Sequence, residues 1–188
     1  MSQTLAIFGG SFDPPHVGHT LVAAYVMAAH GCDRVLVVPT GQHAFGKRLS
    51  PLAHRVRMCE MAMACLRNVE VSSIEGSLPA PNRTLHTIEA IAATYPNVQL
   101  RLVLGSDLLS ETHAWHNFAR VTELAPLIVI ERQGHERADA SSPALPAVSS
   151  TDMRRRLRAG ESTASWLCPS VAAYATQHQL FTAAQRDD

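Results

Sequence analysis

Short apolar runs alternate along this chain with longer segments in which apolar residues recur at helical spacing. Five short runs rich in Val, Ile and Leu predict strands, at residues 5–8, 34–38, 69–71, 100–104 and 127–130. The segments between them predict helices, at residues 18–29, 52–66, 84–94 and 117–124. Near-continuous apolar strands that alternate with helices are typical of a parallel sheet covered on both faces. The pattern therefore predicts an α/β fold with a doubly wound parallel sheet.

The pattern changes after residue 130. Residues 132–147 are polar and contain Gly134, Pro143 and Pro146, which favours a surface excursion over a linker to another domain. Residues 148–181 are again helical in character: Ser149-Ser150-Thr151 supplies a helix N-cap, and Pro169 suits the first turn of a last helix that ends near His178. We therefore expect residues 1–188 to form a single domain with a core at 4–131 and a small C-terminal helical portion.

Composition narrows the classes of partner. With 46% hydrophobic and 17% charged residues, 188 residues can bury one substantial core. Sixteen basic residues balance sixteen acidic ones, so the overall charge does not indicate binding to nucleic acid or to a membrane surface. The sequence shows no signal peptide, no apolar stretch long enough to span a membrane and no C-x-x-C pair, which favours the cytoplasm. Any anion site must be local.

A glycine-rich turn between the first predicted strand and the first helix carries the clearest chemistry. Its sequence is Gly9-Gly10-Ser11-Phe12-Asp13-Pro14-Pro15-His16-Val17-Gly18-His19. The paired glycines let the backbone approach a ligand closely, and the helix that follows offers unpaired N–H groups to an anion. If the helix begins near Pro15, His16 and His19 share one face and can both donate to phosphate oxygens, while Gly18 leaves room for the phosphate chain. In the alternative reading the histidines only cap or pack a helix and the glycines only make a turn.

This stretch resembles the G-x-F-D-P-x-H-x-G-H signature of the HxGH nucleotidyltransferases, and its F-D-P-P-H form is most similar to the bacterial nicotinate-mononucleotide adenylyltransferase family. The resemblance extends from Leu5 to Phe181, with gaps in two loops. It implies a Rossmann-like nucleotidyltransferase fold and an enzyme that binds ATP. Neither the G-x-G-x-x-G spacing nor the G-K-[ST] ending of a P-loop is present.

A second motif, Val148-Ser149-Ser150-Thr151-Asp152-Met153-Arg154, resembles the family's I-S-S-T-x-x-R. Hydroxyl groups at a helix N-cap and the free N–H groups of the first turn form an anion site, and Arg154, one turn further on, can donate two hydrogen bonds to a triphosphate. In isolation the segment also fits an ordinary Ser/Thr cap followed by a solvated basic face.

Two further positions follow from the resemblance. Gly105-Ser106-Asp107 is similar to the family's G-x-D, whose carboxylate holds a ribose diol. Asp107 also fits a helix N-cap, which is compatible with that role. Trp115, an indole among polar neighbours, resembles the family tryptophan that stacks on the pyridine ring; core packing is the alternative.

Two loops depart from the family pattern. After Pro39 the family reads P-P-H-K or P-P-H-R, whereas this chain reads Thr40-Gly41-Gln42-His43-Ala44-Phe45-Gly46-Lys47-Arg48, with an extra residue. We expect Lys47 to contact phosphate, and Arg48 is the second candidate for this contact. The family's S-Y-T-x-D-T-L is only partly kept, as Asn82-Arg83-Thr84-Leu85-His86-Thr87-Ile88, in which His86 stands where an aspartate is usual.

The resemblance implies adenylyl transfer from ATP to nicotinate mononucleotide in NAD biosynthesis, with Mg²⁺ bridging phosphate oxygens and no dedicated protein metal site. The open alternatives are transfer to nicotinamide mononucleotide or phosphopantetheine, and a nucleotide-binding sensor without turnover. The sequence leaves the oligomeric state open, a homo-oligomer included. The expected catalytic residues are His16, His19, Lys47 and Arg154. The expected ATP-binding residues are Gly9, Gly10, Ser11, Phe12, His16, Gly18, His19, Gly105, Asp107, Ser150, Thr151 and Arg154. The expected acceptor-binding residues are Thr84 and Trp115.

Overall fold

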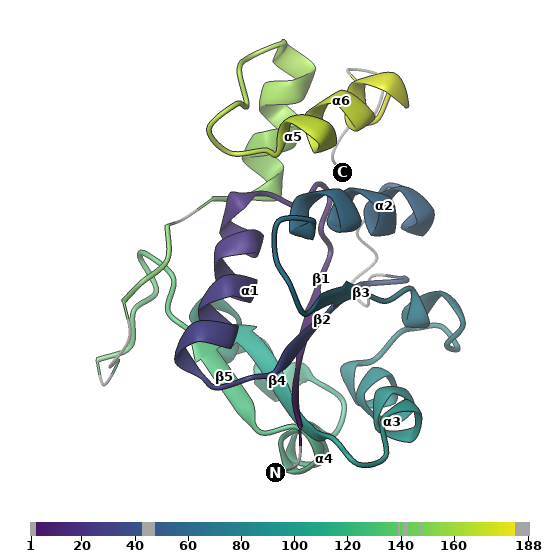
Figure 1. Cartoon of the computed structure of the whole chain (residues 1–188), viewed down its shortest axis with the longest axis vertical. Coiled ribbons are helices and arrows are strands. Elements are labelled where there is room, and N and C mark those ends of the chain that lie inside the picture. Colours follow the sequence, from purple (N-terminus) through teal and green to yellow (C-terminus); the bar gives the residue numbers. More distant parts are fainter. Residues whose placement is uncertain (1–2, 43–47, 139, 141–142, 147, 183–188) are drawn as a thin grey trace.

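A five-stranded parallel sheet forms the centre of the molecule, in the order β3-β2-β1-β4-β5 (Figure 1). The computed structural model describes residues 3–42, 48–138, 140, 143–146 and 148–182. The strands are β1 Thr4–Gly10, β2 Arg34–Pro39, β3 Val69–Val71, β4 Gln99–Gly105 and β5 Leu127–Ile130. The strand order reverses direction between β1 and β4, and in sheets of this kind ligands bind beyond the carboxyl ends of the strands at that point.

Helices connect and cover the strands in the predicted alternation. They are α1 Val17–Ala29, α2 Leu52–Met63, α3 Thr84–Thr94, α4 Phe118–Leu124, α5 Ser150–Ala159 and α6 Pro169–Gln177. Two 3₁₀ segments, η1 Ile74–Gly76 and η2 Ser106–Ala114, complete the described elements. No helix among the described residues is long and apolar enough to cross a membrane.

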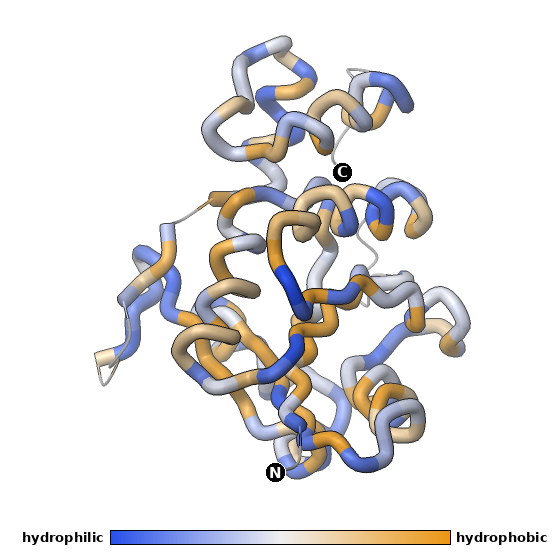
Figure 2. Tube along the Cα trace, viewed as in Figure 1, coloured by the Kyte–Doolittle hydropathy of each residue, from blue (hydrophilic) through white to orange (hydrophobic). Residues whose placement is uncertain are grey.

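Each strand sends alternate side chains into two hydrophobic layers. On one face Ala6 and Val37 pack with residues of α1 and α2. On the other face Ile7 and Leu36 pack with Ile88 of α3 and with α4. This period of two is the property of a strand that is buried on both sides. Figure 2 shows the resulting concentration of hydrophobic residues along the strands.

The C-terminal helices lie over the end of the sheet at which β1 terminates (Figure 1). Val171 and Ala175 of α6 pack against Met58 of α2. Met153 of α5 and Val148 pack against Leu167. The C-terminal portion is thereby fixed beside the turn that follows β1.

The strands match their predicted positions, and the differences lie at element ends. Helix α2 stops at Met63, three residues before the predicted end, because residues 64–65 form a turn. Helix α1 begins at Val17 with His16 as its N-cap, two residues later than a start near Pro15. The sequence analysis also missed η2, whose 3₁₀ geometry leaves no 3.6-residue apolar pattern to detect.

Candidate active site at the carboxyl end of β1

The turn after β1 is held in a strained conformation by a buried aromatic ring. Phe12 has a φ of 48°, in the left-handed region that side chains rarely adopt, and its ring is buried. That ring meets Phe8 edge-on at 5.3 Å between centroids and His19 at 4.8 Å. Because strain of this kind persists only where its surroundings impose it, the packing of Phe12 fixes both the path of the turn and the position of His19.

The two predicted histidines lie together, with ring centroids 3.8 Å apart and planes at 25°. The His16 backbone N–H donates to Nδ1 of His19 at 3.1 Å. Nδ1 of His19 therefore carries no proton, and in the neutral ring the proton resides on Nε2, which is left to donate. Each neutral imidazole offers a phosphate one N–H donor.

Burial and positive neighbours keep both rings neutral. Burial first, then the Arg132 guanidinium, lower the pKa of His16 to about 4. Burial, His16 and Arg132 lower the pKa of His19 well below its ordinary value. Nδ1 of His16 is buried without a hydrogen-bond partner. The site is therefore prepared for a ligand that brings hydrogen-bond acceptors and negative charge.

The reason for Gly18 differs from the predicted one. A Cβ at this position would stand 3.1 Å from Cε1 and Nδ1 of His16 and 3.7 Å from Cβ of Val148. The space above Gly18 is thus taken by the His16 ring rather than left open for a phosphate chain. Its lack of a side chain allows the stacked pair of histidines to form.

Helix α5 contacts this turn through the predicted hydroxyl and guanidinium groups. The Ser149 side chain caps the helix by accepting from the Asp152 N–H, as expected. The Ser150 hydroxyl donates to the Pro14 carbonyl at 2.9 Å, and the Arg154 guanidinium donates to the Asp13 carbonyl at 2.7 Å.

Arg154 is itself buried, at 4% exposure, and also donates to the Thr151 hydroxyl at 3.2 Å. In this structure its guanidinium binds the turn between β1 and α1, residues 11–16, which is called the phosphate turn below. Arg154 therefore joins α5 to the turn, and its predicted contact with a triphosphate stays a prediction.

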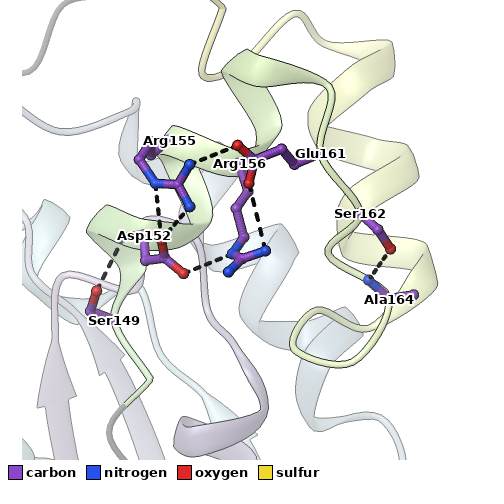
Figure 3. A network of polar contacts seen from close by, with 7 residues as sticks. All are labelled: Ser149, Asp152, Arg155, Arg156, Glu161, Ser162 and Ala164. Carbon is purple, nitrogen blue, oxygen red and sulfur yellow. Dashed lines mark hydrogen bonds and ion pairs between the residues drawn. The ribbon is translucent and has the colours of Figure 1, made fainter.

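The basic run that follows Arg154 is neutralised locally. Arg155 and Arg156 are both paired with Asp152 and Glu161, at distances from 2.8 to 3.6 Å (Figure 3). These acidic partners reduce the run's capacity to attract phosphate backbones, in line with the balanced overall charge.

Asp107 lies at the carboxyl end of β4, close to the same turn. Its Oδ2 accepts from Arg132 at 2.8 Å, and its Oδ1 is buried without a partner. The N-cap of η2 is Gly105, and Asp107 lies in the first turn, so the N-cap interpretation of Asp107 is wrong. A Cβ at Gly105 would collide with Asp107 Oδ1, so the glycine permits the carboxylate to fold back over the strand end. An unpaired carboxylate oxygen here suits a hydroxyl donor.

The predicted acceptor residues lie on the neighbouring elements. Thr84 is the first residue of α3, and Trp115 ends η2. The indole is half-buried: it meets Phe118 edge-on at 5.8 Å and packs on the core layer beneath α3 and α4. Core packing at Trp115 is therefore confirmed, and stacking on a ligand stays a prediction that the uncovered part of the ring permits.

The loop after β2 is anchored to this region. The Gln42 N–H donates to Asn82 Oδ1, two residues before α3, at 2.6 Å. Lys47, the expected phosphate contact, lies outside the described residues. Arg48, the second candidate for this contact, lies within the described residues and is exposed.

Two buried or half-buried arginines were missed by the sequence analysis. Arg132 lies two residues after the end of β5. It donates to Asp107 and to the Val148 carbonyl, and it lowers the pKa of both histidines. Its place just beyond the carboxyl end of a buried parallel strand was the available signal. Arg55 lies in the middle of α2, where no motif marks it, and only the structure shows that its side chain is buried.

Comparison with known proteins assigns the chain to a class. Residues 7–156 match the family model described as cytidylyltransferase-like, and the chain belongs to this family. Its relatives then narrow the assignment. It is 40% identical over 182 residues to a probable nicotinate-nucleotide adenylyltransferase of Anaeromyxobacter dehalogenans, covering 95% of this chain and 97% of the relative. It is 31% identical to the corresponding protein of Thermus thermophilus, covering 94% and 98%.

Solved structures agree on the fold. The nicotinic acid mononucleotide adenylyltransferase of Plasmodium falciparum complexed with NaAD superposes with a TM-score of 0.80 at 19% identity, covering 95% of this chain and 97% of that one. The same Plasmodium protein complexed with APC gives a TM-score of 0.76 at 18% identity, with the same coverage of 95% and 97%. At these identities the likeness concerns the fold, which is the predicted α/β nucleotidyltransferase architecture.

Proposed function

We propose that this protein transfers the adenylyl group of ATP to nicotinate mononucleotide, giving nicotinate adenine dinucleotide and pyrophosphate. The observation that carries the proposal is the pair of neutral, stacked imidazoles at the carboxyl end of β1, with the hydroxyl-bearing end of α5 bound to the same turn. The relatives' names support the choice of acceptor.

The proposed chemistry is an in-line displacement at phosphorus. A phosphate oxygen of nicotinate mononucleotide attacks the α-phosphorus of ATP, the P–O bond to the β-phosphate breaks, and the electron pair leaves with pyrophosphate. Because a phosphate monoester is already ionised at neutral pH, no side-chain nucleophile or strong general base is required. The protein has to align the two substrates and stabilise the charge that moves to the leaving group.

In this scheme the residues around the turn have separate tasks. Nε2–H of His19 and the His16 ring donate to phosphate oxygens, and the free N–H groups at the start of α5 beside Ser150 and Thr151 add further donors. Oδ1 of Asp107 accepts from the ribose hydroxyls. Lys47 supplies positive charge from the loop after β2.

The acceptor site is assigned to Thr84 and Trp115. The half-buried indole presents a surface on which a pyridine ring can stack, and the N-terminus of α3 at Thr84 offers backbone N–H groups to the nicotinate carboxylate.

Mg²⁺ enters this scheme with ATP. The described residues contain no group of three or more His, Cys, Asp or Glu side chains that could hold a metal ion. Mg²⁺ would be held mainly by substrate phosphates and water, as is usual for this ion. When bound, the ion neutralises phosphate charge.

The decisive experiment measures pyrophosphate release by the purified protein with ATP, Mg²⁺ and one of three acceptors. Nicotinate mononucleotide should be turned over, with nicotinate adenine dinucleotide identified by mass spectrometry. Preferred turnover of nicotinamide mononucleotide or phosphopantetheine would replace the acceptor but keep adenylyl transfer. Tight ATP binding by calorimetry, without turnover of any acceptor, would support a nucleotide sensor and contradict the proposal.

A further inference from the structure

Arg55 is a fully buried arginine in the middle of α2, with only 1% of its surface exposed. Its guanidinium donates to three backbone carbonyls in two different segments: Ser50 O at 2.8 Å, Ser11 O at 3.0 Å and Gly41 O at 3.4 Å. Ser11 belongs to the phosphate turn after β1. Gly41 and Ser50 lie at the two ends of the connection from β2 to α2. A single side chain therefore joins the turn to this connection.

The surroundings compensate the buried charge. Burial lowers the pKa of Arg55, and the negative charges of Asp13 and Glu75 oppose that shift, so the guanidinium keeps its proton. Asp13 lies in the phosphate turn, is 3% exposed, and accepts from the Ser50 N–H at 3.0 Å. The carbonyl and the N–H of Ser50 are thus both bound, one by Arg55 and one by the turn itself.

The bond to Ser11 determines the orientation of a peptide group in the phosphate turn. In a planar trans peptide the C=O and N–H groups point in opposite directions. While the Ser11 carbonyl faces the guanidinium, the Phe12 N–H must face away from it. Rotating this peptide would break a charge-assisted hydrogen bond and leave donors of a buried cation without a partner. Arg55 therefore selects one arrangement of the turn's backbone donors.

Gly41 links Arg55 to helix α3, which begins at the proposed acceptor residue Thr84. Its carbonyl accepts from Arg55, while its N–H donates to Glu75 Oε2 at 2.9 Å. The other oxygen of Glu75 accepts from the Thr87 hydroxyl of α3 at 2.8 Å. Gly41 is closely packed, because a Cβ at this position would stand 2.7 Å from the Glu75 carbonyl oxygen and from Asn82 Oδ1. The guanidinium, Gly41 and Glu75 form one chain of bonds from the phosphate turn to the acceptor helix.

We propose that Arg55 is a positioning residue of the active site: by binding the carbonyls of Ser11, Gly41 and Ser50 it fixes the phosphate turn against the loop after β2. It contacts no substrate and acts through the backbone of these segments. The inference rests on the proposed function only in requiring that the turn binds ATP. A lysine cannot replace it, because one ammonium on a flexible chain lacks the rigid, divergent donors that span three carbonyls.

The test compares Arg55→Lys and Arg55→Met with the wild-type enzyme in steady-state kinetics, varying ATP and nicotinate mononucleotide in turn. Because misplacement of a binding group by about 1 Å costs on the order of 10²-fold, we expect Arg55→Lys to lower kcat/KM for ATP by ~10²-fold, with a much smaller change in the KM for the acceptor. Wild-type kinetics in Arg55→Lys would overturn the proposal. So would equal losses toward both substrates that match the fraction of unfolded protein measured by circular dichroism.

Arg57→Met is the matched control, because Arg57 lies on the same helix with a 56% exposed side chain paired with Glu60. It should show unchanged kinetics. If the Arg55 variants fail to fold, Gly41→Ala tests the same restraint from the loop side, since the new Cβ has to displace Gly41 from Glu75 and Asn82. It should reproduce the selective loss for ATP, and unaltered ATP kinetics in Gly41→Ala would count against the proposal.

A calorimetric titration with ATP separates this inference from the proposed acceptor. Weaker ATP binding by Arg55→Lys than by the wild type supports the positioning role even if another acceptor proves correct. Equal ATP affinity and equal kcat in the two proteins would overturn the positioning role while leaving adenylyl transfer intact.

Discussion

At the scale of single residues, the candidate site holds two imidazoles that are kept neutral. His16 and His19 have lowered pKa values because they are buried and lie near Arg132. A neutral ring is a fixed hydrogen-bond donor whose contribution grows as negative charge develops on the atom it faces. This property suits the release of pyrophosphate better than ground-state binding of ATP.

His19→Ala should therefore lower kcat far more than it raises the KM for ATP. Removing one preorganised donor typically costs on the order of 10²–10³ in rate, about 3–4 kcal/mol. Steady-state kinetics with ATP varied provides the measurement, and His30→Ala, at the exposed end of α1, is the control. Activity of His19→Ala within about threefold of wild type would remove His19 from this role.

The pKa of His16 also makes a prediction for stability. The folded value is about 4 and the ordinary value 6.5, so between these pH values the unfolded chain binds a proton that the folded chain does not. The contribution of His16 to the free energy of unfolding is then largest above about pH 6.5. It decreases as the pH falls toward 4, by at most about 3 kcal/mol.

Urea unfolding between pH 7 and pH 4.5 tests this prediction. His16→Gln should lose less stability on acidification than the wild type, whereas His30→Gln should follow the wild-type curve. Identical pH dependence in His16→Gln and wild type would show that His16 does not carry the effect.

At the scale of elements, the site is made by ends of elements that meet. Strand β1 delivers the turn, and helix α5 is bound to that turn through Ser150 and Arg154. Arg154 is buried and bonded, whereas Arg155, one residue further on, is 54% exposed and pairs with Asp152 and Glu161. The two arginines thus have different roles on one helix.

Arg154→Met should reduce kcat/KM for ATP and destabilise the fold by roughly 1–3 kcal/mol, because the Asp13 carbonyl loses its donor. Arg155→Met should change stability by no more than about 1 kcal/mol, the usual contribution of an exposed pair, and leave the kinetics unchanged. Chemical unfolding and ATP kinetics of both variants check the contrast. Equal effects of the two substitutions would refute it.

We propose that the loop after β2 supplies the remaining cation. Lys47→Ala should weaken ATP binding more than Arg48→Ala, if the extra residue in this loop precedes Lys47. A side-by-side calorimetric titration with ATP decides the matter. A larger loss in Arg48→Ala would mean that the loop alignment is shifted by one residue.

At the scale of the whole molecule, the sheet brings the residues proposed to bind the two substrates to adjacent strand ends. The phosphate turn follows β1, Asp107 follows β4, and α3 with Trp115 borders the acceptor side. We propose that the chain forms one domain, because the C-terminal helices pack directly on α1 and α2.

Nicotinate mononucleotide should be preferred over nicotinamide mononucleotide by at least ~10²-fold in kcat/KM, because backbone N–H donors at a helix start favour a carboxylate over an amide. Trp115→Ala should weaken both acceptors by a similar factor, roughly 1–3 kcal/mol by analogy with base stacking, and leave the preference in place. Kinetics with both acceptors provide the test. Equal turnover by the wild-type enzyme would contradict the specificity.

Much of the architecture was predictable because it depends on local and periodic properties. Apolar runs located all five strands, and the Ser149 cap and Pro169 located the starts of α5 and α6. That the G-G-S-F-D-P-P-H-V-G-H turn binds phosphate stays a prediction. The match to the nucleotidyltransferase family extended these inferences to the fold.

The tertiary structure alone decided which groups become partners. In sequence, Arg55 is an ordinary helical arginine and Arg132 belongs to a polar stretch. Segments far apart in the chain meet at the carboxyl ends of the strands. This meeting buries the two arginines, brings Arg55 to Ser11 and Arg132 to Asp107, and lowers the pKa of the histidines. Desolvation and electrostatic interactions depend on distance in space, so a one-dimensional pattern can name the residue types for the chemistry but not their protonation or partners.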